Sequence, residues 1–120
     1  YATGKLVLWS KQAGFVDEKG EVLRSGRFKR IAIANPKLAP YGAAALETLH
    51  KLGLVQELQT KFVQGENIAQ TFQFVNTENA QLGFVALAQV YSEGKITYGS
   101  GWIVPNHLHK PIHQDAVFQH

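Results

Sequence analysis

Hydrophobic residues along the chain form short runs typical of buried strands, and these runs alternate with helical patterns. The runs predict strands at 4–10, 30–34, 61–63, 80–90 and 95–105, with a single helical turn near 21–24. Apolar residues at 46, 49 and 52 repeat at helical spacing after the second strand, and those at 68, 72 and 75 define one face of a second helix after the third. This order of elements is that of an α/β domain with parallel strand pairings.

The first long helix is predicted to begin at or next to Tyr41. Pro40 suits the first helical position because it has no N–H to lose there, and Gly53 after Lys51 is an ordinary helix end. The first backbone N–H groups of a helix lack intrahelical partners and carry the positive end of the helix dipole, so this start is a candidate seat for an anion. Water or a side chain satisfies such groups at most helices, so the helix start alone does not establish an anion site.

A second helix start follows the next predicted strand. Asn67 and Gln70 have the spacing of a capping box, which makes Ile68 the first helical residue. The strand at 30–34 could lie in the sheet between the two strands that follow it in the chain, at 61–63 and 80–90. The chain connections would then leave in opposite directions at its carboxyl end, which is where ligands bind in open α/β sheets. The loops at 35–41 and 65–68 would then face one crevice.

Composition narrows the classes of function. The chain has 120 residues, enough for one domain with its own core, and it has no cysteine, which excludes disulfides, thiolate catalysis and cysteine-ligated zinc. No apolar run approaches the ~18 residues of a membrane span, and we expect a soluble chain. The net charge is +3, and the basic cluster that contributes to it interleaves with a single aromatic residue, Phe28, so we interpret it as a solvated face rather than a nucleic-acid patch. The cluster comprises Arg24, Arg27, Lys29 and Arg30.

Candidate catalytic and metal-binding residues form no recognisable motif. The five histidines, at 50, 107, 109, 113 and 120, match no zinc spacing, and there is no nucleophile elbow, Walker loop or dinucleotide fingerprint. Ser100 between two glycines is typical of a turn, and the carboxylates at 17, 18 and 21 are typical of a solvated edge. We therefore expect neither an enzyme nor a resident metal or cofactor.

Four segments taken in order resemble the molybdate-binding periplasmic proteins of bacterial ABC uptake systems. They are IANPKLAPYGAAALETLHKLGL at 33–54, KFVQGENIAQTFQFV at 61–75, AQLGFVALAQV at 80–90 and GSGWIVPNHLHKPIHQDAV at 99–117. The resemblance implies an α/β lobe of a type II periplasmic-binding-protein fold, with a mixed sheet of about five strands and helices on both faces. In that sheet the strand at 5–9 would oppose the others and the strand at 30–34 would be central.

The resemblance also implies how the chain is organised. Residues 1–120 would form the second, inserted lobe of a two-lobed protein, with hinge segments near 1–4 and 112–118. Tyr1 is not an initiator methionine and the last residues have the pattern of an extended segment, so we expect a piece of a longer protein. Self-association through the exit segment 114–118 is an expectation of the same kind.

The implied ligand is molybdate or tungstate, held by backbone N–H groups of Tyr41 and Ile68, with Pro40, Gly42 and Asn67 supporting the two helix starts. Some family members place a tyrosine hydroxyl on the anion where this chain has Ala86, so that donor is missing here. The implied partners are a membrane permease and the first lobe, in the periplasm, with no nucleic acid and no metal beyond the oxyanion.

Two alternatives stay open from the sequence. The chain could be the effector-sensing lobe of a transcription regulator with the same fold, or it could serve another oxyanion such as sulfate or phosphate. The residues that precede Tyr1 in the parent gene would separate a regulator from an exported protein.

Overall fold

A computed structural model describes residues 3–113 and shows a five-stranded mixed sheet, which confirms the predicted fold class. The strand order is β4–β3–β5–β2–β8. Its strands are β2 (Leu6–Ser10), β3 (Ile31–Ala34), β4 (Phe62–Gly65), β5 (Leu82–Ala86) and β8 (Ser100–Ile103). β3 pairs in parallel with β4 and β5, whereas β2 is antiparallel to both β5 and β8. β2 therefore runs against the other four strands, as predicted.

β3 lies between β4 and β5, the two sheet strands with which it pairs in parallel. A crevice at its carboxyl end, as predicted from the sequence, requires this arrangement. β5, not β3, is the middle strand of the five, so the expectation that the strand at 30–34 is central holds only in the sense that it is not an edge strand. β5 takes the middle place because it pairs with β3 on one side and with the opposed β2 on the other.

Two long helices cover opposite faces of the sheet. Alternate residues of β2 and β3 point to opposite sides, so Leu8 and Ile33 pack in one hydrophobic cluster and Trp9 and Ala32 in another. The first cluster includes residues of α2 (Pro40–Leu52), and the second includes Val75 of α4 (Ile68–Asn76). Helices on both faces are thus confirmed.

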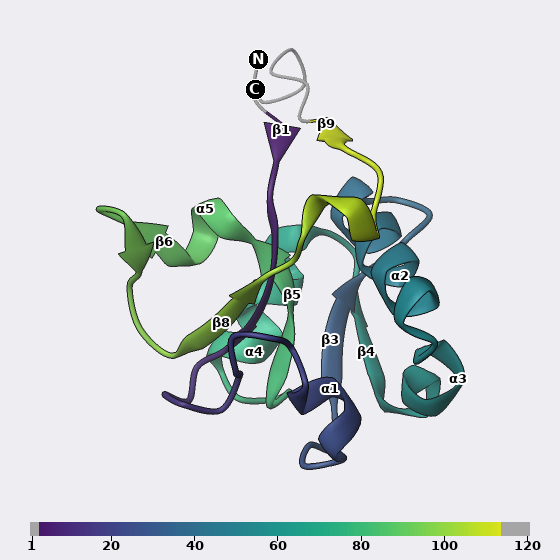
Figure 1. Ribbon diagram of the computed structural model, residues 1–120, viewed down its shortest axis with the longest axis horizontal. Helices are drawn as coiled ribbons and strands as arrows, with labels where there is room; N and C mark the ends of the chain where they lie inside the picture. Colours follow the sequence, from purple (N-terminus) through teal and green to yellow (C-terminus); the bar gives the residue numbers. More distant parts are fainter. Residues whose placement is uncertain (1–2, 114–120) are drawn as a thin grey trace.

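Short elements complete the chain. They are α1 (Val22–Ser25), α3 (Val55–Leu58), α5 (Leu87–Val90), the 3₁₀ turns Gln59–Lys61 and Asn106–Leu108, and the two-residue strands β1 (Thr3–Gly4), β6 (Tyr91–Ser92), β7 (Lys95–Ile96) and β9 (Ile112–His113). β1 and β9 pair antiparallel and lie side by side at the top of Figure 1. They fall in the two expected hinge segments, but residues 1–2 and 114–120 lie outside the described residues, and so does the expected self-association surface.

Two predicted strands were wrong in extent. The run at 80–90 leaves the strand at Ala86 and becomes α5, because Gln89 turns back to accept the Ala86 N–H at 3.0 Å and Leu87 donates its N–H to the Lys5 carbonyl. The run at 95–105 divides into β7 and β8 because Gly99 adopts a positive φ of 77°. Short apolar runs do not distinguish strand from helix by periodicity.

The longest described helix is α2, at 13 residues. No helix within residues 3–113 has the length and apolar content needed to cross a bilayer.

Candidate functional site

The two predicted helix starts meet at one edge of the sheet. β3 and β4 are parallel neighbours, so their carboxyl ends, Ala34 and Gly65, lie at the same edge, and the loops that lead into α2 and α4 both leave from there. The backbone N–H of Asn35 donates a hydrogen bond of 2.7 Å to the carbonyl oxygen of Gly65 and joins these loops directly. Although α2 and α4 cover opposite faces, their first turns are therefore held at a common edge.

The start of α2 is built by the backbone of its own loop. Asn35 accepts the N–H groups of Leu38 and Ala39 on its carbonyl oxygen, and its side-chain oxygen accepts the Lys37 N–H at 2.9 Å. Ala39 is the N-cap, in extended conformation and without a side-chain oxygen, and Pro40 is the first helical residue as predicted. The helix dipole at this start is thus not offset by a capping side chain.

Gly42 allows α2 to begin close to the sheet. A Cβ on Gly42 would collide with the carbonyl oxygen of Ala34, the last residue of β3, and would lie 2.9 Å from the carbonyl carbon of Asn35. The first turn of α2 therefore packs directly on the end of β3, and only glycine fits there without displacement. The role of Gly42 in supporting an anion site stays a prediction.

The start of α4 has the predicted N-cap, Asn67. Its side-chain oxygen accepts the Gln70 N–H at 2.8 Å, and the Gln70 side-chain oxygen accepts the Glu66 N–H at 2.7 Å, one residue earlier than in a standard capping box. The first intrahelical hydrogen bond runs from Thr71 N–H to the Asn67 carbonyl, so the N–H groups of Ile68 and Ala69 precede it. These two groups form the positive end of the α4 dipole.

Ile68 reaches over the sheet edge. Ile68, Phe72 and Val75 are spaced by four and three residues along α4, so they share one helix face as the sequence predicted. Their packing nevertheless divides between two clusters. Phe72 and Val75 belong to the cluster under α4, whereas Ile68 packs against the cluster that contains Tyr41 on the α2 side. The first residue of a helix lies at the end of its contact with the sheet, so its side chain can turn to the opposite face. This packing ties the two helix starts together through one core.

Gln89 links the start of α4 to the end of β5. Its side-chain oxygen accepts the Ala86 N–H at 3.0 Å, and its side-chain nitrogen donates to the Ile68 carbonyl oxygen at 3.2 Å. Ala86 is buried at the carboxyl end of β5, the parallel neighbour of β3 on its other side. The carboxyl ends of three adjacent parallel strands thus contribute residues to this edge.

The Tyr41 side chain connects this edge to the β1–β9 pair. Tyr41 is 6% exposed, and its ring lies against the backbone of Gly4, where an added Cβ would be 2.9 Å from the Tyr41 Cζ and 3.3 Å from Ile112. The backbone of Tyr41 therefore lies in the first turn of α2, at the sheet edge where the two loops meet, while its ring fills the core beneath β1 and β9.

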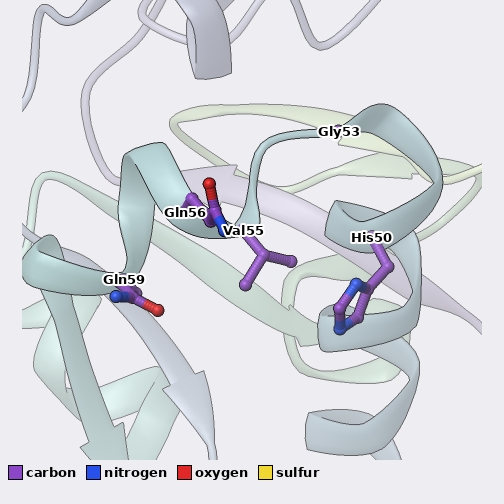
Figure 2. A pocket seen from close by; sticks show the side chains of 5 residues that line it. All are labelled: His50, Gly53, Val55, Gln56 and Gln59. Atoms are coloured by element: carbon purple, nitrogen blue, oxygen red, sulfur yellow. The ribbon is translucent and has the colours of Figure 1, made fainter.

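Of three described cavities, two lie away from both helix starts, and the third borders the loop and first turn of α2 through Pro36 and Ala43. Figure 2 shows one of about 430 Å³ at the opposite end of α2, where His50 and Val55 extend from its wall beside Gly53. This is the carboxyl end of α2, whose dipole disfavours an anion. A groove of about 530 Å³ follows the outer side of α2, and a cavity of about 300 Å³ lies beside β1. Neither Tyr41 nor Ile68 lines any of these three, so a concavity shared by both helix starts stays a prediction.

The other candidates from the sequence have structural roles or stay dispersed. Within residues 3–113 no three histidine or carboxylate side chains converge as metal ligands. Phe28 is 2% exposed beneath Lys61 and cannot stack on a base, while Arg24 donates to the Leu52 carbonyl. Asp17, expected at a solvated edge, accepts backbone N–H groups from three residues of its own turn.

Sequence reasoning missed the residues that hold the two loops together. Gln89 was assigned to a strand, and because the residue three positions before it is Ala86, which has no side-chain oxygen, the sequence carried no capping-box signal there. Like Gly42, Gly65 lies at a close contact between a strand end and a helix start, because a Cβ there would lie 2.6 Å from Thr71 Oγ1. A glycine two residues before a capping residue is a weak signal for such contact.

The chain is similar to known binding proteins. The family model described as bacterial extracellular solute-binding protein matches residues 1–118. Proteins named molybdate-binding protein ModA are 61% identical over 98% of this chain in Azotobacter vinelandii and 52% identical over 98% in Rhodobacter capsulatus. The chain covers 46% and 45% of those proteins, so it spans about half of their length.

Solved structures give the same picture. A periplasmic molybdate-binding protein of Azotobacter vinelandii superposes with a TM-score of 0.89 at 43% identity, over 93% of this chain and 49% of that one. A substrate-binding domain of a putative molybdenum ABC transporter from Clostridium difficile superposes with a TM-score of 0.74 at 25% identity, over 92% and 47%. The resemblance predicted from the four sequence segments is confirmed.

Proposed function

Because the chain belongs to the family of bacterial extracellular solute-binding proteins, we propose that it forms one lobe of a two-lobed protein that binds a tetrahedral oxyanion, foremost molybdate. The observation that carries this proposal is the hydrogen bond from Asn35 N–H to the Gly65 carbonyl, which holds the starts of α2 and α4 at one sheet edge. Relatives named as molybdate-binding proteins over nearly the whole of this chain support the choice of anion.

The backbone N–H groups of Tyr41 and Ile68 are the proposed donors, with Pro40, Gly42 and Asn67 supporting them. Fixed amide dipoles at helix starts attract a dianion without a counter-charge, so no buried ion pair has to break on release. Ala86 supplies no hydroxyl at the end of β5, and this lobe therefore relies on backbone donors. Tungstate has the same shape and charge and is bound in the same way.

The remaining functional assignments follow from the same relationship. We infer a binding protein rather than an enzyme, acting in the periplasm and delivering its anion to the membrane permease of an ABC transporter. The first lobe of the parent protein supplies the other half of the anion site. Nucleic acid is not a partner, and no cofactor is needed.

A substitution pair at Ile68 tests the donor directly. Asn67 has φ of −146° and ψ of 176°, the extended conformation that a residue before proline prefers, and proline is well tolerated at the first helical position. Ile68→Pro in the two-lobed protein therefore removes one N–H with little effect on α4. A hydrogen bond to a charged group is worth roughly 1.5–3 kcal/mol, so molybdate affinity should fall at least about tenfold.

Ile68→Ala is the matched control, since it removes the side chain but keeps the N–H. Both variants are titrated calorimetrically with molybdate, tungstate, sulfate and phosphate, and urea unfolding without ligand checks that their stabilities agree. Equal affinity of the proline and alanine variants for molybdate would show that the Ile68 N–H does not bind the anion. A wild-type protein that prefers sulfate or phosphate would replace the proposed anion.

A further inference from the structure

The Tyr41 ring lies against the two short strands near the ends of the described chain. Gly4 of β1 pairs with Ile112 of β9, and the ring occupies the space directly beside Gly4. Tyr41 is 6% exposed and Ile112 is 2% exposed, and both belong to the hydrophobic cluster on the α2 side of the sheet. The residue whose backbone supplies one proposed anion donor is therefore packed by its side chain against both expected hinge segments.

Space, and not backbone conformation, calls for glycine at position 4. Gly4 is not among the described glycines with positive φ, so its backbone conformation is open to other residues. A Cβ there, however, would collide with the Tyr41 hydroxyl group and lie 2.9 Å from Cζ of the same ring. The ring cannot swing aside freely because it is almost fully enclosed. Glycine inside a strand often marks such a close approach, and here it lets the ring pack directly on the β1 backbone.

The segment that leads to β9 is also attached to α2 farther along the helix. The Lys110 N–H donates to the Glu47 carboxylate at 2.8 Å, and the Lys51 ammonium donates to the His107 carbonyl at 3.0 Å. Figure 1 shows this yellow segment beside the helix. Together with the Tyr41 ring, these contacts span about 15 Å of α2, since a helix rises about 1.5 Å per residue. A displacement of β9 relative to this lobe would therefore be passed to α2 and to its first turn.

We propose that Gly4 is a positioning residue of the anion site. Its missing side chain lets the Tyr41 ring pack on the β1–β9 pair, and this contact fixes the Tyr41 N–H relative to the strands that lead toward the other lobe. The inference deepens the proposed function and rests on it, because it requires both an anion at Tyr41 and a second lobe. An anion held by Tyr41 then favours one position of the hinge segments, and that position favours the anion to the same extent.

Gly4→Ala in the two-lobed protein tests the position directly. The added methyl group displaces the ring and the first turn of α2, and we expect the Kd for molybdate to rise at least about fivefold, the lower end of typical coupling between sites. Gly101→Ala is the matched control, because Gly101 is also a strand glycine without positive φ, and its added Cβ would lie 2.7 Å from Ile96 Cδ1. The control should lose stability in urea but keep its affinity. A Gly4→Ala variant that binds molybdate as tightly as the control overturns the proposal.

A double-mutant cycle with Tyr41→Phe shows whether the ring transmits the effect. Phenylalanine keeps the backbone N–H and removes the hydroxyl group that the new Cβ would meet first. Gly4→Ala should therefore raise the Kd by a factor at least about two times smaller in the Tyr41→Phe background than in wild type. Equal factors in the two backgrounds would show that Gly4 acts without the ring, and this result would overturn the proposal.

Tyr41→Leu covers the case in which Gly4→Ala does not fold. Leucine keeps the N–H but cannot fill the space against β1 and β9, so the molybdate Kd should again rise at least about fivefold. Leu23→Val is the control, because it shortens a side chain of the same cluster that belongs to α1 and not to a helix start of the anion site. Unchanged affinity in Tyr41→Leu would overturn the proposal.

Titration of the unmodified two-lobed protein keeps this test separate from that of the proposed function. If that protein binds no oxyanion, the proposed function is refuted and the inference falls with it. If wild type binds molybdate and Gly4→Ala binds it equally well, only the inference is refuted, and the proposed donors at Tyr41 and Ile68 are unaffected.

Discussion

The side-chain amide of Gln89 donates a hydrogen bond of 3.2 Å to the backbone carbonyl oxygen of Ile68, the first residue of α4. The same side chain accepts the Ala86 N–H at 3.0 Å, so one residue joins the end of β5 to a helix start on the neighbouring strands. Gln89 therefore positions the proposed donor, the Ile68 N–H, without being one of the proposed anion donors itself.

Replacing Gln89 with alanine should lower both stability and anion affinity. Two hydrogen bonds are lost, each worth roughly 0.5–1.5 kcal/mol, and the start of α4 gains freedom to move. We expect urea unfolding of the chain to show a loss of about 1–3 kcal/mol and titration of the two-lobed protein to show weaker molybdate binding. Gln73→Ala on the exposed side of α4 is the control. Unchanged stability in Gln89→Ala would mean that these bonds merely replace bonds to water.

Asn67 can be tested for two roles with two substitutions. Asn67→Ala removes the cap of α4 and should cost about 1 kcal/mol in urea unfolding. Asn67→Asp keeps a capping oxygen and favours the helix dipole, so it should preserve stability, yet its charge should repel molybdate in the two-lobed protein. If the aspartate variant binds molybdate as tightly as wild type, the anion does not lie at the start of α4.

At Gly42 the usual effect of glycine in a helix should be reversed. Glycine to alanine inside a helix ordinarily stabilises by roughly 0.5–1 kcal/mol. Here the new Cβ would collide with the Ala34 carbonyl oxygen, so Gly42→Ala should destabilise by about 1–3 kcal/mol and displace the start of α2. Ala43→Gly, next to it on the exposed side, is the control and should show only the ordinary cost of about 1 kcal/mol. A stabilised Gly42→Ala variant would show that α2 can shift freely.

The sequence was sufficient for the parts of the fold that local chemistry determines. Proline at the first helical position and the asparagine cap located the starts at Pro40 and Ile68 correctly, because both act within a few residues of themselves. The opposed direction of β2 came from the family resemblance. The break at Ala86 could not be predicted, since it depends on Leu87 N–H reaching the Lys5 carbonyl, a partner more than 80 residues away in the chain.

The candidate site was predictable to the same extent. The residues at both helix starts were found from capping signals and from the resemblance, whereas the contacts that hold the loops together were not. The Asn35–Gly65 bond and the packing of Ile68 on the α2 side join segments that only the sheet brings side by side. His109 carried no local signal of burial, since its neighbours His107 and Lys110 are exposed.

Asp17 should make stability depend on acid pH. Partial burial raises the pKa of its carboxyl, but the backbone N–H groups of Glu21, Val22 and Lys19 stabilise the carboxylate and together hold the pKa below the ordinary value. A lowered folded-state pKa adds stability above the unfolded pKa of about 4, and this stability is lost as pH falls through the folded pKa.

Asp17→Asn should therefore be less stable than wild type at pH 6, with a difference that shrinks as pH falls below about 4. Because the carboxylate is largely exposed, the effect should be small. Urea unfolding at a series of pH values measures it, with exposed Glu18→Gln as the control. A difference between Asp17→Asn and wild type that stays constant with pH would assign the cost to turn geometry and not to charge.

The 120-residue chain should bind molybdate far more weakly than the two-lobed protein. As one lobe of a two-lobed protein, the chain holds half of the proposed donors. These donors face water, where an amide-to-oxyanion hydrogen bond replaces an equally good one to solvent. No second lobe closes over the anion, so the gain from a dry, preorganised cavity is lost. We expect affinity to fall at least about a hundredfold, the equivalent of roughly 3 kcal/mol. Calorimetric titration measures the affinity, and light scattering of the same sample measures the mass. Submicromolar binding by a monomer would mean that the first turns of α2 and α4 form a complete anion site by themselves, and that the other lobe serves delivery rather than recognition.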